Sequence, residues 1–403
     1  VEEAFHGKEA STQVRHALIK LLLHGCGCDL DQEALLCAWQ FACPAPQDVR
    51  AEILEEVSKH DGAFQTLVRL AEANLPFARQ LLSELGPARA TLCVFGGLGE
   101  GDRLLDTVEH FSPGRGAWEA MPAMSKERVL LAVAALEGRI YVLGGYHQSP
   151  GQLAMACLDD AERFDPESRT WEVLPHMPTK RSHLSAVALE GRLYVLGGKC
   201  RGVPALATAE RFDPSLSSWE ALPPMTTARA WHAAVALGGR VYALAGHDGR
   251  RPTNVVERFD PMLNAWEAMP PMLTPRVSLG AASLGRRIYA LGGDRSLDGT
   301  VERFDPRLRT WEATPPMPMG RTRLATVALG GRIYALGGKP SEADGCVSDV
   351  HAFDPITAAW EASPPLLAPR SHFAAAACHV HPRPRTLHAA HEVTVACEGC
   401  ACM

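Results

Sequence analysis

The sequence predicts an all-β protein, a six-bladed β-propeller at residues 89–378 preceded by a small α-helical region. Two periodic signals predict it. A Gly-Gly pair closes an apolar segment in five copies, at Gly96-Gly97, Gly144-Gly145, Gly197-Gly198, Gly292-Gly293 and Gly337-Gly338, and Ala245-Gly246 is a degenerate sixth copy. Six of the eight Trp residues of the chain occupy one position of the same repeat: Trp118, Trp171, Trp219, Trp266, Trp311 and Trp360.

Each copy has the pattern of four β-strands. An apolar run such as Val129 to Leu136 suits a strand that is buried on both faces. A turn with Gly follows, and a second strand of the type Ile140 to Leu143 ends at the Gly pair, where a side chain would meet the neighbouring strand. The third strand has the pattern Glu-Arg-Phe-Asp and stops at Asp-Pro, as at Asp165-Pro166, because this dipeptide begins turns. The Trp opens the fourth strand, and we expect Trp and Tyr of the repeat to pack between blades.

The two ends of the repeat region predict how the ring closes. The first copy has a poor first strand, whereas the sixth copy is followed by one extra first strand, Arg370 to Cys378, with no Gly pair after it. We expect this last strand to complete the first blade, which leaves no unpaired sheet edge. The sequence therefore predicts six blades rather than seven.

The segments on either side of the repeats have other patterns. Residues 1–88 show apolar positions at intervals of three to four, which predicts an α-helical N-terminal region. Residues 379–403 form a His- and Cys-rich tail that we expect to be disordered; its Cys397 and Cys400 leave zinc binding as an alternative, although we expect no metal.

Composition excludes several classes of protein. The net charge of −6 does not favour nucleic-acid binding, because no basic excess is present to neutralise phosphates. No apolar run is long enough for a membrane span, and we expect no membrane association. The 12 Cys are scattered rather than arranged as a disulfide framework, which favours a cytoplasmic or nuclear location.

The Gly-Gly, Tyr and Trp positions, repeated six times over about 290 residues, resemble the kelch repeat. The resemblance implies a β-propeller with one four-stranded blade per repeat. Closure by a C-terminal strand is similar to that of the kelch-like substrate adaptors, which combine BTB, BACK and kelch domains. Residues 1–88 occupy the position of a BACK domain, and no BTB domain is recognised in the chain.

Two sets of loops are expected to meet on one face of the ring, and this face is the predicted binding surface. One set precedes the first strands and contains an Arg in every copy: Arg128, Arg181, Arg229, Arg276, Arg321 and Arg370. Six Arg around one mouth would form a cationic funnel for acidic peptides. By resemblance to the adaptors that bind acidic segments, Ser182 and Ser371 join Arg181 and Arg370 in that pocket. The alternative is that each Arg binds loop carbonyls and is structural.

The other set of loops follows the Gly pairs, and it contributes Tyr146 and His247 to the predicted partner-binding residues. Tyr146 opens the longest of these loops. No paired-carboxylate, Ser-His-Asp or phosphate-loop motif is recognised, so we expect no enzyme activity and no cofactor. The family resemblance implies a protein-interaction module that acts as a substrate receptor of a cullin-type ubiquitin ligase. The alternative is a cytoskeletal, actin-binding or scaffolding kelch protein without a ligase role.

Overall fold

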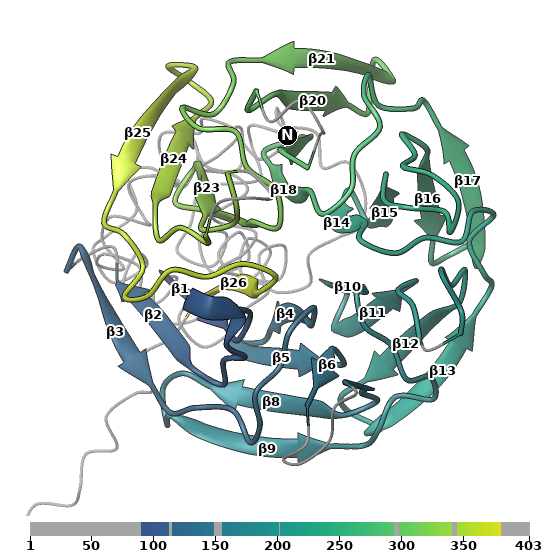
Figure 1. The fold of residues 1–403 in the computed structure, drawn as a ribbon. Coiled ribbons are helices and arrows are strands. Elements are labelled where there is room, and N and C mark those ends of the chain that lie inside the picture. The colour runs from purple at the N-terminus through teal and green to yellow at the C-terminus, as the bar shows by residue number, and fades with distance from the viewer. Residues whose placement is uncertain are drawn as a thin grey trace, which may run out of the picture.

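The computed structural model describes residues 90–112, 115–148, 155–200, 202–293, 298–340 and 345–379. The predicted helical region at 1–88 and most of the tail at 379–403 lie outside these residues. Within them the chain forms six four-stranded antiparallel sheets arranged around a centre, as Figure 1 shows, so the predicted six-bladed propeller is confirmed. No helix in this part of the chain is long and apolar enough to cross a membrane.

The blades are numbered here along the chain, each from its innermost to its outermost strand. Blade I consists of β26 (Ala374–His379), β1 (Ala90–Phe95), β2 (Val108–Ser112) and β3 (Ala117–Met121). Blade II consists of β4 (Ala132–Leu136), β5 (Arg139–Leu143), β8 (Ala161–Asp165) and β9 (Thr170–Leu174). Blade III consists of β10 (Ser185–Leu189), β11 (Arg192–Leu196), β12 (Ala209–Asp213) and β13 (Ser218–Leu222). Blade IV consists of β14 (Ala233–Leu237), β15 (Arg240–Leu244), β16 (Val256–Asp260) and β17 (Ala265–Met269). Blade V consists of β18 (Gly280–Leu284), β19 (Arg287–Leu291), β20 (Val301–Asp305) and β21 (Thr310–Thr314). Blade VI consists of β22 (Ala325–Leu329), β23 (Arg332–Leu336), β24 (Val350–Asp354) and β25 (Ala359–Ser363).

Two small elements were not expected from the sequence. A 3₁₀ helix, η2 (Glu100–Asp102), follows the Gly pair of blade I, and a short hairpin of β6 (Tyr146–His147) and β7 (Ala156–Cys157) follows that of blade II. The first strand of each blade is also shorter than expected. In blade II it begins at Ala132 rather than at Val129, because Leu130 has a φ of 58° and cannot belong to a strand.

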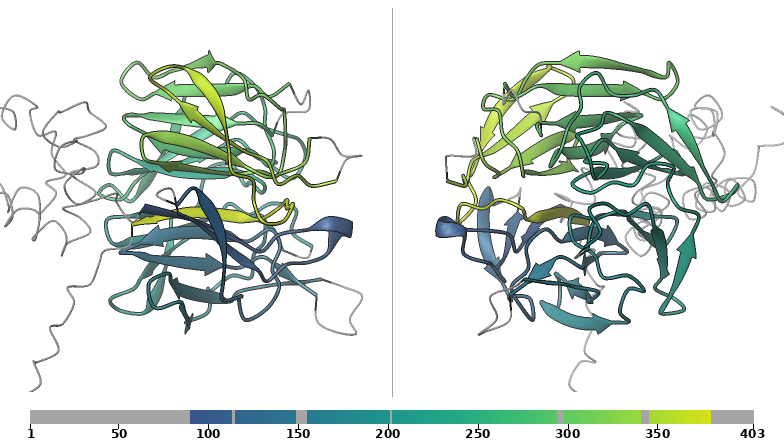
Figure 2. Two further views of the ribbon diagram at one scale, coloured as in Figure 1. Left: turned by 90° about the vertical axis from the view of Figure 1, so that its left-hand side faces the viewer. Right: turned by 45° about the vertical axis from the view of Figure 1, so that its right-hand side comes forward.

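The ring closes as the sequence predicts. The C-terminal strand β26 pairs with β1, with Ala374 opposite Phe95 and His379 opposite Ala90. The first blade is thus built from both ends of the repeat region, and no blade is left with an unpaired inner strand. Both ends of the described chain leave blade I at the Ala90–His379 end of this pair. Figure 2 shows the ring from the side.

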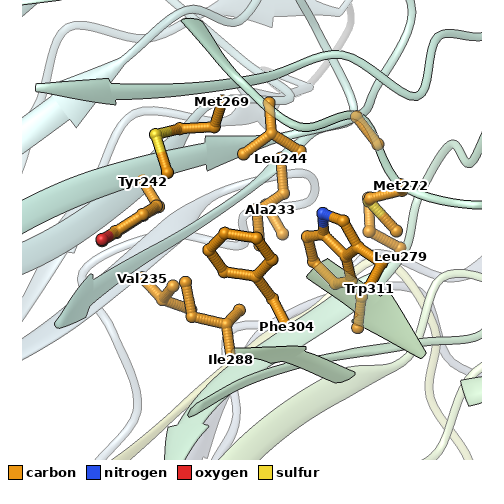
Figure 3. Packing of buried hydrophobic residues seen from close by; sticks show 13 residues of the cluster. Ala233, Val235, Tyr242, Leu244, Met269, Met272, Leu279, Ile288, Phe304 and Trp311 are labelled. Carbon is orange, nitrogen blue, oxygen red and sulfur yellow. The ribbon is translucent and has the colours of Figure 1, made fainter. Parts of the chain in front are cut away.

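The core lies between blades rather than within them. Figure 3 shows the cluster between blades IV and V, where Tyr242 and Leu244 of β15 face Phe304 and Trp311 of blade V. The expected packing role of Trp is confirmed here. Each Trp also donates its indole N–H to a proline carbonyl of the preceding blade, at 2.8–3.1 Å: Trp118 to Pro364, Trp171 to Pro122, Trp219 to Pro175, Trp266 to Pro223, Trp311 to Pro270 and Trp360 to Pro315.

Candidate functional site: the loop face of the propeller

The loop face is defined here by the loops that precede the innermost strands together with those that follow the second strands. The Gly pairs hold this face together. Gly144 has a φ of 58°, and a Cβ atom at this position would lie 2.5 Å from the carbonyl oxygen of Arg181 in the next blade. The next residue, Gly145, donates its N–H to that same carbonyl at 3.0 Å. The pair is therefore required where one blade contacts the next.

The six predicted arginines do not line the mouth of the ring. All six side chains are buried, with an exposed fraction of 0%. Each turns inward and donates to the carbonyl at the end of the second strand of its own blade: Arg128 to Gly144, Arg181 to Gly197, Arg229 to Ala245, Arg276 to Gly292, Arg321 to Gly337 and Arg370 to Gly96. Because the six arginines are buried, they do not form the predicted funnel of accessible guanidinium groups. The alternative, that each Arg binds loop carbonyls and is structural, describes these side chains.

Five of these arginines form an ion pair with a buried glutamate of the third strand. The pairs are Arg128–Glu162, Arg181–Glu210, Arg229–Glu257, Arg276–Glu302 and Arg370–Glu109. The glutamates also accept hydrogen bonds from the segment between blades. Glu257, for example, accepts from the backbone N–H of Thr226 at 2.7 Å and of Thr227 at 3.0 Å. Through these hydrogen bonds, each Arg–Glu ion pair stabilises one loop of the loop face.

Blade VI differs, because His351 occupies the glutamate position. Nη2 of Arg321 lies 2.7 Å from Nδ1 of His351, so this ring nitrogen must accept the hydrogen bond and the imidazole must be neutral. Burial and the neighbouring Arg321 lower the pKa of His351, which agrees with that assignment. Burial also lowers the pKa of Arg321, and the charge of Asp349 partly offsets this shift.

A closed circle of backbone hydrogen bonds surrounds the mouth of the ring, and the sequence did not predict it. The residue two positions after each Arg has a φ of 54–58°. Its N–H donates to the carbonyl of the equivalent residue in the preceding blade, at 2.8–3.1 Å, so that the six bonds form a circle: Leu130 to His372, His372 to Arg323, Arg323 to Ser278, Ser278 to Trp231, Trp231 to His183 and His183 to Leu130. We call these six residues the mouth ring.

The mouth ring brings an aromatic cluster together on the side of blades II to IV. The rings of His183 and Trp231 have centroids 4.3 Å apart, and Tyr146 and His247 extend the series at 5.6 Å from His183 and 5.8 Å from Trp231. Nζ of Lys199 lies 4.2 Å from the centroid of Trp231, a cation–π contact. Tyr146 and His247, both predicted from sequence, belong to this cluster. His183, Lys199 and Trp231 were not predicted as binding residues.

The opposite side of the mouth ring is basic. Arg323 and His372 belong to the ring, and Lys339 follows the Gly pair of blade VI, with Nζ 3.5 Å from Asp102. Burial, followed by the charges of Arg323 and Lys339, lowers the pKa of His372 to about 3. Burial, followed by the charges of Lys199 and His372, lowers the pKa of His183 to about 2. Both imidazoles are therefore neutral at physiological pH, and Lys199, Arg323 and Lys339 place positive charge close to them.

The two predicted serines are not exposed on this face. Ser182 and Ser371 are fully buried, and Ser182 donates to the carbonyl of Lys199 at 3.3 Å. Ser182 therefore holds the loop that carries Lys199, whereas the hydroxyl of Ser371 lies 3.3 Å from Nδ1 of His372.

One group of three potential metal ligands occurs among the described residues. The ligand atoms of Asp159, Asp160 and His176 lie within 4.8 Å of one another, on the outer part of blade II. Asp160 already forms an ion pair with Lys126 at 2.9 Å. The Cys and His residues of the tail that were considered for zinc lie outside the described residues, apart from the backbone of His379.

Comparison with known proteins agrees with this architecture. The family model described as the KLHDC2/KLHL20/DRC7 Kelch-repeats domain matches residues 87–293 and 132–338, and the Kelch motif matches residues 320–367. The chain belongs to the kelch-repeat family. Both matching models describe kelch repeats.

Two curated relatives and one solved structure illustrate the similarity. Kelch-like protein 33 from Homo sapiens is 36% identical over 98 residues, which cover 24% of this chain and 17% of the relative. Kelch domain-containing protein 8B from Mus musculus is 37% identical over 101 residues, which cover 24% of this chain and 27% of the relative. The match thus spans about a quarter or less of each relative's length. The structure titled "Structure of YjhT" has a TM-score of 0.57 at 15% identity, covers 69% of this chain and 97% of its own, and supports the fold alone.

Proposed function

We propose that this kelch propeller is a protein-interaction module that binds a protein partner at the mouth ring on its loop face. The observation that supports this most directly is the series Tyr146, His183, Trp231 and His247 with the ammonium group of Lys199 against Trp231. Tyr146, Trp231 and His247 are partly exposed, whereas His183 is buried beneath them. Partly exposed aromatic side chains beside a cation, on loops that a rigid scaffold holds, are typical of binding surfaces. The repeat itself does not require them, because blades II, V and VI carry Leu130, Ser278 and Arg323 at the mouth-ring positions.

The partner that fits this surface best carries an acidic segment. Three cations, Lys199, Arg323 and Lys339, surround the mouth, while Asp102 is the carboxylate that pairs with Lys339. A carboxylate placed between them would be attracted from several sides. The acidic partner proposed from sequence is thus retained, with these cations in place of the six buried arginines.

The cellular role that we propose is that of a substrate receptor for a cullin-type ubiquitin ligase in the cytoplasm or nucleus. Its support is the resemblance of the repeats and of their closure to the kelch-like adaptors. The alternative is a cytoskeletal, actin-binding or scaffolding protein that uses the same loop face. Affinity capture of the full chain from cells discriminates the two: cullin among the captured proteins supports the ligase role, and actin without cullin supports the alternative.

A pair of charge reversals tests the binding surface itself. Lys199→Glu places a carboxylate against Trp231, whereas Arg307→Glu makes the same charge change at an exposed position in the turn between β20 and β21, at the other end of the strands. We expect Lys199→Glu to reduce capture of the acidic partner at least tenfold, which corresponds to about 1.4 kcal/mol. Arg307→Glu should leave capture unchanged, and both variants should keep the melting temperature of the wild type. Equal capture by the two variants would exclude the mouth ring as the binding surface.

A further inference from the structure

Two cysteines from different blades meet at the edge of the loop face, beside Lys199. Cys157 is the last residue of β7, in the hairpin that follows the Gly pair of blade II. Cys200 directly follows Lys199, after the Gly pair of blade III. Both are free thiols and both are partly exposed, so that small reagents can reach them.

The contacts around Lys199 place the two sulfur atoms together. Sγ of Cys157 donates to the carbonyl oxygen of Lys199 at 3.4 Å, and this carbonyl carbon is bonded to the backbone nitrogen of Cys200. The side chains of Cys200 and Ser182 are also near enough to the Cys157 thiol to affect its pKa. The backbone beneath them is held by the hydrogen bonds between Ser182 and Lys199, at 2.8 and 3.0 Å. The thiols therefore approach each other on two fixed loops.

We propose that Cys157 and Cys200 form a reversible disulfide bond, with hydrogen peroxide as the oxidant. In the first step the sulfur of Cys200 attacks one peroxide oxygen and the O–O bond breaks, which gives a sulfenic acid and one water. In the second step the sulfur of Cys157 attacks the sulfenic sulfur and a second water leaves. Two thiols have then lost two electrons and two protons, and one peroxide has become two waters.

The order of the two steps follows from the surroundings of Cys157. Burial, followed by the contact with Cys200, raises the pKa of the Cys157 thiol to about 12. Because the thiolate is the reactive form, Cys157 is a poor first nucleophile towards peroxide, and we assign it the second, intramolecular step. The disulfide bond would join the β6–β7 hairpin to the loop that carries Lys199, and thus link the redox state of the pair to the position of the ammonium group over Trp231.

Peptide mapping of the full chain tests this proposal. Trypsin cuts after Arg139 and Arg163 and after Lys199 and Arg201, so that the disulfide adds the dipeptide Cys200-Arg201 to peptide 140–163. After treatment with hydrogen peroxide, blocking of free thiols and digestion without reductant, we expect most of peptide 140–163 to carry this added mass. Dithiothreitol should remove it, and Cys157→Ser and Cys200→Ser should abolish it.

Cys346→Ser is the matched control, because Cys346 is also a partly exposed thiol but lies in blade VI. This variant should give the same linked peptide as the wild type. The proposal is overturned if peroxide leaves Cys200 unmodified, oxidises it to a sulfenic or sulfinic acid without the link, or joins it to a cysteine other than Cys157. The wild-type map decides between these results even if a serine variant fails to fold.

Discussion

Arg276 is the buried arginine of blade V, and its replacement by Ala tests whether these side chains are structural. Its guanidinium group donates to the carbonyl oxygens of Gly292 at 2.7 Å and Thr300 at 3.0 Å, to Oγ1 of Thr300 at 2.9 Å and to Oε1 of Glu302 at 2.8 Å. Arg276→Ala removes all of these bonds at once. It leaves the carboxylate of Glu302 in the interior without its cation.

The expected cost is large because both partners are buried. Removal of one partner of a buried ion pair costs about 3–5 kcal/mol. Glu302 keeps hydrogen bonds from the backbone N–H groups of Leu273 and Thr274, so the lower end of this range applies, about 3 kcal/mol. For a domain of about 290 residues, that loss lowers the melting temperature by roughly 5 °C.

Thermal unfolding followed by circular dichroism and urea unfolding at 25 °C measure this effect. The double variant Arg276→Met, Glu302→Leu fills the same space without charge and should recover much of the lost stability, since a buried pair is often replaced by apolar residues at little cost. If Arg276→Ala instead melts within about 1 °C of the wild type and loses its partner, Arg276 is a ligand contact and the structural account of the arginines is wrong.

Three further predictions concern blade contacts. Gly280→Ala should destabilise the fold by about 1–3 kcal/mol in urea unfolding, because its Cβ would lie 1.8 Å from Oγ1 and 2.8 Å from Cβ of Thr326. Thr326→Ala in the same chain removes the closer of these atoms and should recover part of that loss, and equal losses with and without it would refute the contact. His351→Glu supplies Arg321 with the carboxylate that the other five arginines have, so its melting temperature at pH 7 should rise by a few degrees; a fall would contradict this reading of blade VI. Burial lowers the pKa of His232 well below 6.5 and keeps it neutral in the folded chain. Because the unfolded chain then binds more protons below pH 6.5, stability should fall from pH 7 to pH 5, by about 2 kcal/mol for this one group. His232→Leu with Ser185→Ala should lose that share of the pH dependence in urea titrations, and an unchanged slope would exclude His232.

The repeat made the fold predictable from the sequence. Trp and the Gly pairs recur because the same contact between neighbouring blades is made six times, so each copy repeats the same physical requirement. The closing strand was predictable for the same reason, since the first copy has a poor innermost strand and the sixth copy is followed by one extra innermost strand. The helical region expected at residues 1–88 remains a prediction.

The binding residues were predictable only in part. The sequence indicated the correct loops for the arginines but not the direction of their side chains, which depends on the carbonyl groups and glutamates that the folded blade places beneath them. The mouth ring was not predicted from the sequence, because its residues share a backbone conformation and not a chemical type. The residues Leu130, His183, Trp231, Ser278, Arg323 and His372 have no common side chain. The signal that could have found it is a variable residue two positions after an arginine present in every copy.

Site-specific photo-crosslinking tests the central claim most directly. A benzophenone amino acid is introduced at Tyr146, on the loop face, or at Leu308, an exposed residue in the turn between β20 and β21 at the other end of the strands. The account predicts that the acidic partner is crosslinked from position 146 and not from position 308. Crosslinking from position 308 alone would contradict it.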